Sequence, residues 1–394
     1  MISVKQAQSQ ILKHLSRLGT EQIKLSSAIK RVLASDVKSP VSHPLFNQSA
    51  VDGFAIRFKD LKSGRNIFRI IGESKAGKFR NFTVKPNDTV RIFTGVLVPA
   101  GFDTVIMQED IKIKQGNIIV KSLPLYGVNV RKKGEQIKKG MTALRKGTVL
   151  NSASIGFLAS LGINKVRVSG LPNVNIIVTG DEFTKLAGKL RKGSIYESNG
   201  LMLTSLLGVM NIKAHSSLCK DDLSTLTKLI KKETEKNDIV IVTGGVSVGD
   251  YDFTERVLKN LNFKIIFHKV SQKPGKPILF AKKKNKTVFG LPGNPRSVLI
   301  CFLEYVYPFI QASMGKREPF LKSLNFPLAK GYKKNEVKTL FLSSKLTGRG
   351  VEIFEGQASH MLKSFSDADA IVCLPEGKKN YRKGELVDVH ILPK

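Results

Sequence analysis

Residues 240–252 read Val240-Ile-Val-Thr-Gly-Gly-Val-Ser-Val-Gly-Asp-Tyr-Asp252, an apolar run followed by a glycine-rich one. The β-branched first half predicts a buried strand, and the glycines predict a loop. A second apolar strand is expected at 175–179, with helices at 201–207 and 221–234. Buried strands that alternate with helices are typical of a parallel sheet covered on both faces. The sequence therefore predicts a doubly wound α/β domain over residues 171–318.

The rest of the chain divides into regions with different apolar spacing. The first forty residues are predicted to be helical, and a helix at 152–161 is expected to return to them. Between Phe54 and Ile119 the apolar residues come in short β-branched bursts separated by Gly, Pro, Asn and Asp, and short strands with glycine turns recur after Pro319. The predicted organisation is a helical or extended linker domain (1–40 and 140–170), a β-rich inserted domain (41–139), the α/β domain, and a small C-terminal β-barrel (319–394).

The composition of the 394-residue chain is that of a folded globular protein, with 41% hydrophobic and 24% charged residues. The N-terminus alternates apolar and polar residues, unlike a signal peptide. The most apolar long stretch, 298–314, carries Glu304 and Gln311 and is predicted to be a buried helix, not a membrane span. Its three cysteines have no paired or zinc-ligand spacing. We therefore expect a cytoplasmic protein with reduced thiols.

The formal net charge of +34 raises nucleic acid as a partner. Every region carries an excess of Lys and Arg, however, and none forms a basic tail. The chain has no Trp and no repeat that interleaves aromatic and basic residues, so it has no predicted platform for stacking bases. Small anionic substrates are the favoured partners.

The glycine loop after residue 243 is the strongest local signal of a site. Loops at the carboxyl ends of parallel strands bind ligands, and their glycines let backbone N–H groups approach an oxyanion. The predicted phosphate cradle consists of Gly244, Gly245, Ser247 and Gly249; the alternative is a tight turn. Asp250 and Asp252 beside a phosphate would suit Mg²⁺. Asp221 and Asp222 either cap the following helix or face the same metal.

Two further loops are suited to anions. Lys273-Pro-Gly-Lys-Pro277 projects two ammonium groups from a rigid turn, which would suit a small tetrahedral dianion. Pro292-Gly-Asn-Pro-Arg-Ser297 precedes a long apolar helix, with Asn294 placed to be its N-cap and Pro295 at the first helical position. The six histidines form no ligand spacing and no Ser-His-Asp order, so hydrolysis by a triad is not supported.

Taken in order, these motifs resemble those of the molybdopterin molybdenumtransferases, the MoeA and gephyrin E-domain family. The resemblance covers nearly the whole chain and rests on SAVDGFA (49–55), TGVLVPAGFDTVI (94–106), VRKKGEQI (130–137), TGDEF (179–183), IYESN (195–199), TGGVSVGDYDF (243–253), KPGKP (273–277) and LPGNPRS (291–297). Such an ordered set is far more specific than any one motif.

The resemblance implies an elongated homodimer whose active cleft is shared between subunits. It implies a reaction in which adenylylated molybdopterin is hydrolysed in the presence of Mg²⁺ and molybdate, releasing AMP while molybdenum enters the dithiolene. It also implies contacts with other enzymes of molybdenum-cofactor synthesis.

The resemblance also assigns roles to residues. The functional polar set would be Asp52, Thr94, Glu182, Asp221 and Asp252, with Asp221 and Asp252 as the metal carboxylates. Asp250 stays a further metal candidate because of its place beside the glycine loop. The molybdate pocket would contain Lys273, Lys276 and Ser297, and the pterin loops would add Pro292, Gly293, Asn294, Pro295 and Ser359.

This chain departs from the family pattern at two places. Gln136 stands where the family often has an acidic residue, which weakens any metal role there. Where the family commonly has an arginine after a phenylalanine, this chain reads Phe341-Leu-Ser-Ser344. The expected guanidinium is therefore missing or supplied elsewhere, with Arg349 as a candidate.

Two alternative functions remain open. A molybdopterin adenylyltransferase would share the α/β domain and its glycine loop, but it needs no β-rich insertion or C-terminal barrel. A gephyrin-like scaffold would use the same fold to anchor a peptide, but the chain has no appended partner domain or long linker.

Overall fold

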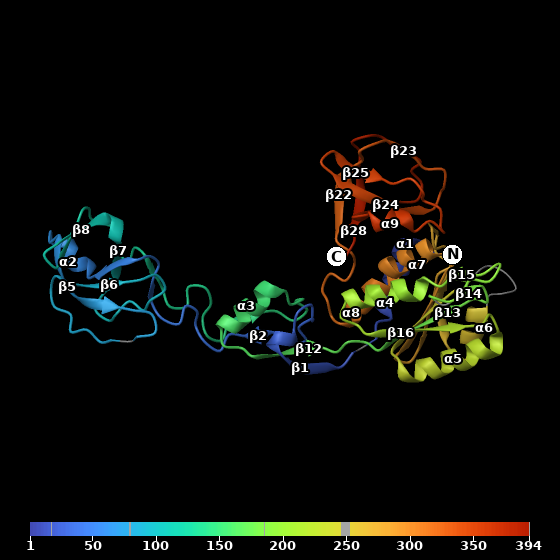
Figure 1. Ribbon diagram of the computed structural model, residues 1–394, viewed down its shortest axis with the longest axis horizontal. Helices are drawn as coiled ribbons and strands as arrows, with labels where there is room; N and C mark the ends of the chain where they lie inside the picture. The colour runs from blue at the N-terminus through green and yellow to red at the C-terminus, as the bar shows by residue number, and fades with distance from the viewer. Residues whose placement is uncertain (17, 79, 185, 246–252, 394) are drawn as a thin grey trace.

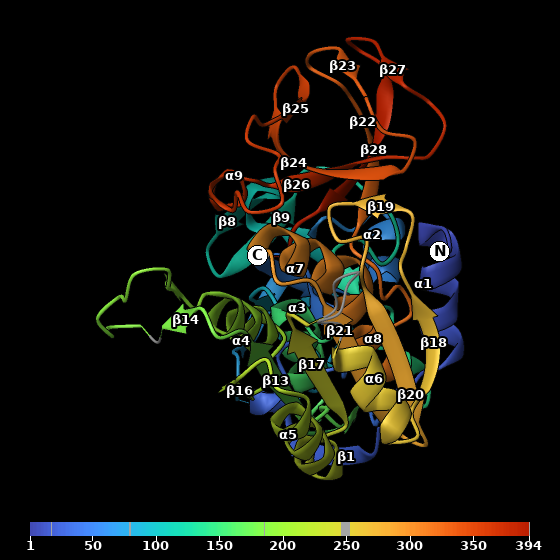
Figure 2. The same ribbon diagram turned by 90° about the vertical axis from the view of Figure 1, so that its right-hand side faces the viewer.

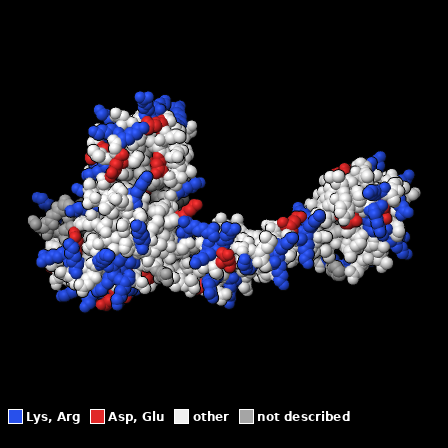
Figure 3. All heavy atoms as spheres, turned by 180° about the vertical axis from the view of Figure 1, so that it is seen from behind, with Lys and Arg blue, Asp and Glu red and all other residues white. Residues whose placement is uncertain are grey.

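The computed structural model describes residues 1–16, 18–78, 80–184, 186–245 and 253–393. The molecule is elongated, with a β-rich unit at one end, a narrow linker with α3 in the middle, and the α/β layers with the C-terminal β-domain at the other end (Figure 1). On the face in Figure 3, Lys and Arg are spread over all of these parts instead of forming one stripe. The charge is therefore distributed on this face as the sequence predicts.

The β-rich unit is a six-stranded sheet in the order β7-β4-β6-β5-β9-β8. Its short apolar strands form hydrophobic clusters around Phe54 and Val90. The elements are β4 (Gly53–Ile56), α2 (Phe58–Lys62), β5 (Ile67–Ser74), β6 (Asp88–Ile92), β7 (Thr104–Met107), β8 (Ile111–Lys114) and β9 (Asn117–Val120). The expectation of β-structure between 41 and 139 is met by these strands.

The linker is formed by two chain segments that run side by side. Antiparallel pairs join β1 to β12, β2 to β11 and β3 to β10, so the β-rich unit is an excursion between two strands of the linker. The elements are β1 (Thr20–Lys24), η1 (Leu25–Ser27), β2 (Val37–Lys38), β3 (Gln48–Ser49), β10 (Val130–Arg131), β11 (Thr142–Leu144), α3 (Ser152–Ser160) and β12 (Lys165–Ser169).

The prediction of helix through the first forty residues is wrong. Helix α1 spans only Val4–Lys13, begins at a Ser3–Gln6 capping box, and is followed by β1. Helix α3 does form where predicted, but it packs on η1, whereas α1 packs on α8 and η3 of the α/β layers. The two helices therefore do not pack together, and β1–β12 pairing joins the segments instead.

The α/β domain has a mixed sheet in the order β16-β13-β17-β21-β20-β18. The first four strands are parallel, as predicted, but β20 and β18 are antiparallel. The strands are β13 (Val174–Thr179), β16 (Ala214–Cys219), β17 (Ile239–Thr243), β18 (Lys264–His268), β20 (Leu279–Lys283) and β21 (Lys286–Leu291). The sheet is therefore mixed, because the chain turns back between β20 and β21 in an antiparallel hairpin.

Both faces of this sheet are covered, since its apolar strands alternate between two cores. Ile239 and Ile241 pack with one core, and Val240 and Val242 with the other. The first core is closed by α1, α4, α7, η3 and α8, and the second by α5 and α6 (Figure 1). These helices are α4 (Asn199–Val209), α5 (Leu223–Lys236), α6 (Phe253–Asn260), α7 (Pro295–Cys301), η3 (Phe302–Val306) and α8 (Tyr307–Ser313).

The apolar stretch at 298–314 is a buried helix, as predicted. It runs from α7 through a π-helical segment, η3, into α8. Pro308 lacks the N–H that would bond the carbonyl of Glu304, which is consistent with the altered pattern there. None of the helices in the described part of the chain has the length and apolar character to cross a bilayer.

The C-terminal β-domain is a curled sheet in the order β19-β24-β26-β28-β22 with β25 beside β24. A bridge between Leu328 and Val351 joins the β22 end to β25. The domain stands over the α7 end of the α/β layers (Figure 2). Its elements are β19 (Gln272–Lys273), β22 (Ser323–Pro327), β23 (Tyr332–Lys333), β24 (Thr339–Thr347), β25 (Gly350–Ile353), α9 (Lys363–Ser366), β26 (Ala370–Leu374), β27 (Asn380–Tyr381) and β28 (Leu386–Ile391).

A triad of ionisable groups, in which Glu304 is buried and Asp388 is partly exposed, joins this domain to the α/β layers. His390 Nδ1 lies 2.7 Å from Glu304 Oε1, and His390 Nε2 lies 3.3 Å from Asp388 Oδ2. Burial disfavours the imidazolium, but the charge of Glu304 and hydrogen bonds to Asp388 and Glu304 outweigh it and raise the pKa of His390 to about 10. His390 is therefore protonated at neutral pH in the folded protein.

This triad predicts a pH-dependent part of the stability. The pKa of His390 is above its unfolded value, so the stabilisation is complete below pH ~6.5 and is lost as the pH rises toward about 10. Between pH 6.5 and 9 the loss is on the order of 3 kcal/mol. Thermal unfolding of wild type and His390→Gln at pH 6 and 9 measures it, since titrating groups that do not contact His390 cancel in the difference. A wild-type advantage that does not shrink at pH 9 contradicts the assignment.

Candidate functional site

Four parallel strands of the α/β sheet end at one edge, and the predicted loops meet there. Thr179 ends β13, Asp221 lies just beyond β16, Gly244 follows β17 and Pro292 follows β21. Two neighbouring cavities of about 650 and 590 Å³ open at this edge, and Pro277, Pro292 and Asn294 line both. The edge is where a sheet of this type binds ligands.

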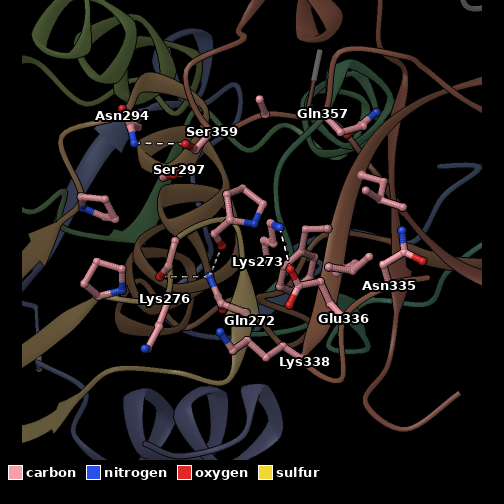
Figure 4. A pocket seen from close by; sticks show the side chains of 18 of the residues that line it. Gln272, Lys273, Lys276, Asn294, Ser297, Asn335, Glu336, Lys338, Gln357 and Ser359 are labelled. Carbon is pink, nitrogen blue, oxygen red and sulfur yellow. Dashed lines mark hydrogen bonds and ion pairs between the residues drawn. The ribbon is translucent and has the colours of Figure 1, made fainter. Parts of the chain in front are cut away.

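The larger cavity lies between the α/β domain and the C-terminal β-domain (Figure 4). Lys273, Lys276 and Ser297, predicted for the molybdate pocket, line it together with Ser359, predicted for the pterin loops. Strand β19 contains Lys273 and pairs with β24, so the 273–277 loop is attached to the C-terminal sheet. These predicted residues are thus brought together from three separate segments of the chain.

Gly275 fixes the path of the 273–277 loop. Its φ is +87°, and a Cβ there would lie 2.4 Å from the sulfur of buried Cys301, so no other residue fits. Beneath it, the side-chain amide of Gln272 donates to Pro274 O at 3.0 Å. The loop is therefore held rigidly from below.

The two lysines of this loop are in different electrostatic states. Lys273 Nζ lies 2.7 Å from Glu336 Oε1 of the C-terminal β-domain, and this contact lowers the pKa of Glu336. The exposed Lys276 ammonium has no hydrogen bond or ion pair within the described ranges. Of the two lysines of this loop, Lys276 is thus the one whose charge has no partner among the described residues (Figure 4).

The loop before α7 differs from its prediction in one respect. Asn294 is the N-cap residue and Pro295 is at the first helical position, as expected, but the Asn294 side chain makes no capping bond. It donates instead to Ser359 Oγ at 3.1 Å. Asn294, which lines both cavities, therefore links the α/β edge to the C-terminal β-domain.

The smaller cavity contains the remaining described loop residues. Its lining includes the predicted residues Glu182, Asp221, Gly244, Gly245, Pro292, Gly293, Asn294 and Pro295. Gly244 has a φ of +86°, and a Cβ there would lie 2.5 Å from Thr179 O. The close approach of these two chain segments is a sufficient reason for a glycine at position 244. The role of Gly244 in a phosphate cradle stays a prediction.

The acidic pair at 221–222 is divided between the two predicted roles. Asp222 caps α5, since its side chain accepts from Thr225 N at 2.7 Å. Asp221 lines the smaller cavity with Glu182. The buried Thr179 Oγ1 and Asn199 Oδ1, in the same lining, have no hydrogen-bond partner among the described residues. This set of oxygen donors fits Mg²⁺, which prefers hard oxygen ligands.

Four predicted residues, Ser247, Gly249, Asp250 and Asp252, lie outside the described residues. Their roles in the phosphate cradle and the metal site stay predictions.

Asp52 and Thr94 form a local pair far from both cavities. Asp52 Oδ1 accepts from Thr94 N and from Thr94 Oγ1, both at 2.8 Å. These two bonds lower the pKa of Asp52. The pair lies in the β-rich unit at the other end of the molecule (Figure 1). Within one chain, the structure does not bring these residues to the other predicted residues.

The structure also shows where the two departures from the family pattern lie. Gln136 lies in the linker, where its backbone N–H donates to His43 O at 3.1 Å. Arg349 lies exposed in the turn between β24 and β25 and does not line the larger cavity, so it is a wrong candidate for the expected guanidinium. The guanidinium beside Phe341 belongs to the buried Arg296.

Sequence reasoning missed several residues that line the two cavities. The C-terminal β-domain adds Tyr332, Lys333, Asn335, Glu336 and Lys338 to the larger one, and His360 lies in the smaller one. The run Lys333-Lys-Asn-Glu-Val-Lys338 was the available signal, but nothing local places it beside 273–277.

Comparisons with known proteins agree with this geometry. Residues 2–162 match a family model described as the MoeA N-terminal region (domain I and II), residues 175–312 a probable molybdopterin binding domain, and residues 325–392 the MoeA C-terminal region (domain IV).

Full-length relatives extend the match. The molybdopterin molybdenumtransferase of Staphylococcus epidermidis is 33% identical, with 98% of this chain and 95% of that protein covered. The protein of that name from Haemophilus influenzae is also 33% identical, with coverages of 99% and 98%. The crystal structure of the molybdopterin biosynthesis MoeA protein from Pyrococcus horikoshii OT3 superposes with a TM-score of 0.88 at 28% identity, over 100% of both chains. The chain belongs to the MoeA family of molybdopterin molybdenumtransferases.

Proposed function

We propose that this protein inserts molybdenum from molybdate into adenylylated molybdopterin and releases AMP. The observation that carries the proposal is the pair of adjoining cavities, one cationic and one lined by glycine loops and carboxylates, at one sheet edge. In the reaction water cleaves the phosphoanhydride bond to AMP, and the two dithiolene sulfurs displace oxo groups of the molybdate, which take up protons and leave as water without a change in the oxidation state of molybdenum.

We assign molybdate to the larger cavity. Lys276 supplies a free ammonium, and the Ser297 and Ser359 hydroxyls are polar groups that can donate to oxyanion oxygens. Lys273 is close by but pairs with Glu336. Donors held on a rigid loop lose little entropy when they bind a small dianion.

The nucleotide-tagged pterin is assigned to the smaller cavity. Gly244, Gly245 and Gly293 line it. The Gly244 N–H already donates to Leu291 O at 3.1 Å, so the N–H groups of Gly245 and Gly293 are the proposed phosphate donors. Asn294, which lines both cavities, would lie between the two substrates.

Asp221, with Glu182 and the Thr179 hydroxyl beside it, would hold Mg²⁺. When bound, the ion would offset the negative charge of the phosphates. The Asp221 and Glu182 carboxylates and the Thr179 oxygen provide the hard ligands, and Asp250 and Asp252 are proposed as further ligands.

The active form is proposed to be a cytoplasmic homodimer. Asp52 and Thr94 lie at the far end of the molecule from their own cavities, and a second copy would bring them to the site. The four domains, with boundaries near residues 40, 140, 170 and 318, would serve this shared arrangement.

Purified protein incubated with adenylylated molybdopterin, Mg²⁺ and molybdate tests the function. We expect AMP release that depends on molybdate. An adenylyltransferase would instead consume ATP in the presence of metal-free molybdopterin, and a scaffold would do neither.

Glu336 is expected to compete with molybdate for Lys273. Replacing Glu336 with glutamine removes the competing charge. Molybdate affinity should therefore rise about two- to fivefold, the change that corresponds to the free energy of an exposed ion pair. Isothermal titration with molybdate measures this. Glu352→Gln, which breaks the similar Lys330–Glu352 pair on the same domain, should leave the affinity unchanged. A weaker affinity in Glu336→Gln would mean that Glu336 orients Lys273.

A further inference from the structure

A single arginine is completely buried where α7 meets the C-terminal β-domain. Arg296 has 0% of its surface exposed. Its Nη1 donates to Gly356 O at 3.1 Å, and its Nη2 donates to Phe341 O at 3.3 Å and to Gln357 Oε1. The guanidinium thus connects the first turn of α7 to strand β24 and to the loop after β25.

All of these partners are neutral. No carboxylate in the described ranges forms an ion pair with Arg296, and its buried Nε has no hydrogen-bond partner there. The ring of Phe365 lies 5.3 Å from the guanidinium carbon. Burial lowers the pKa of Arg296 to about 10, so the group remains charged at neutral pH. A buried charge without a counter-ion is costly, and proteins normally pair such a charge.

The charge lies directly behind the larger cavity. Ser297, the next residue, and both Phe341 and Gln357 line that cavity, while Arg296 itself does not. The Gln357 amide is fixed on both sides, because its Oε1 also accepts from Ser343 N and its Nε2 donates to Phe354 O at 2.6 Å. Ser359, two residues on, is thereby held near Asn294.

We propose that the oxyanion bound in the larger cavity is the counter-ion of Arg296, which acts as a positioning residue behind the cavity wall. It contributes a fixed positive field and holds the 356–359 loop. This inference rests on the proposed function, since it assumes that a dianion such as molybdate binds there.

Molybdate binding to the full chain tests the proposal. Arg296→Met should weaken binding at least about tenfold, the expected loss for a nearby charge in partly buried surroundings, and should remove most of the molybdate-induced rise in Tm. Arg296→Lys should bind within about threefold of wild type at pH 6 and progressively less well toward pH 9, because a buried ammonium loses its proton more readily than a guanidinium. Wild-type binding should change little over that range.

The control is Arg31→Met. Arg31 is a largely buried arginine of the linker that pairs with Glu21, so its loss should affect stability but not molybdate affinity. Unchanged molybdate affinity in Arg296→Met overturns the proposal. The proposal is also overturned if Arg296→Met and Arg296→Lys lose molybdate affinity equally and at every pH. That result would mean that only the hydrogen bonds of the guanidinium matter, and not its charge. If Arg296→Met does not fold, the pH profile of Arg296→Lys decides.

Failure of the proposed function has a different signature. If the proposed function is wrong, the wild-type protein either does not bind molybdate or binds it with the same affinity as Lys276→Ala. Substitutions of Arg296 would then leave this result unchanged.

Discussion

Lys276→Ala is expected to lower molybdate-dependent AMP release by about two orders of magnitude or more, the usual effect of removing one preorganised oxyanion donor. The reason is that Lys276 is the unpaired cation of its loop, whereas Lys273 is already held by Glu336. The other lysines that line the cavity, Lys333 and Lys338, come from the C-terminal β-domain and not from this rigid loop.

The measurement is AMP release from adenylylated molybdopterin over a range of molybdate concentrations. Loss of a molybdate contact should raise the molybdate concentration needed for half-maximal rate as well as lower the rate. Lys330→Ala removes the same charge from a side chain that is 82% exposed on the C-terminal β-domain, and it should behave as wild type. A wild-type rate in Lys276→Ala would refute the role given to this lysine.

Local sequence predicted most of the α/β fold, because burial on two faces leaves a clear apolar signature. Residues 239–243 are fully buried, as their continuous apolar character predicted. The prediction was wrong where distant pairing decided the structure. Residues 20–24, predicted to be helical, are a strand because they pair with the distant segment 165–169.

The site was predicted to a similar degree. Loops that follow parallel strands meet at one edge, so the positions after 179, 219, 243 and 291 could be grouped from the sequence. The contribution of the C-terminal β-domain could not, because Glu336 reaches Lys273 only through packing of separate domains. Arg296 was also missed: its place after Pro295 predicts a helix start, and nothing local predicts its burial.

The second large effect concerns Asp52, which lies far from the cavities of its own chain. Its Oδ1 is fixed by Thr94, so the carboxylate is preoriented at an exposed position. If a two-fold symmetric dimer brings it to the partner's cavity, Asp52→Asn should lower AMP release by about two orders of magnitude, although its own cavities keep every residue.

Complementation distinguishes this arrangement from a site built within one chain. A purified heterodimer of Asp52→Asn and Lys276→Ala subunits would contain one site with both residues intact, so two inactive parents should yield about half of wild-type activity. The reciprocal control pairs wild type with the Asp52→Asn, Lys276→Ala double variant. Both of its shared sites are damaged, so it should be inactive, whereas sites within single chains would leave about half of the activity. The reverse pattern would mean that Asp52 serves the cavity of its own chain, which would require the β-rich unit to move through most of the length of the molecule (Figure 1).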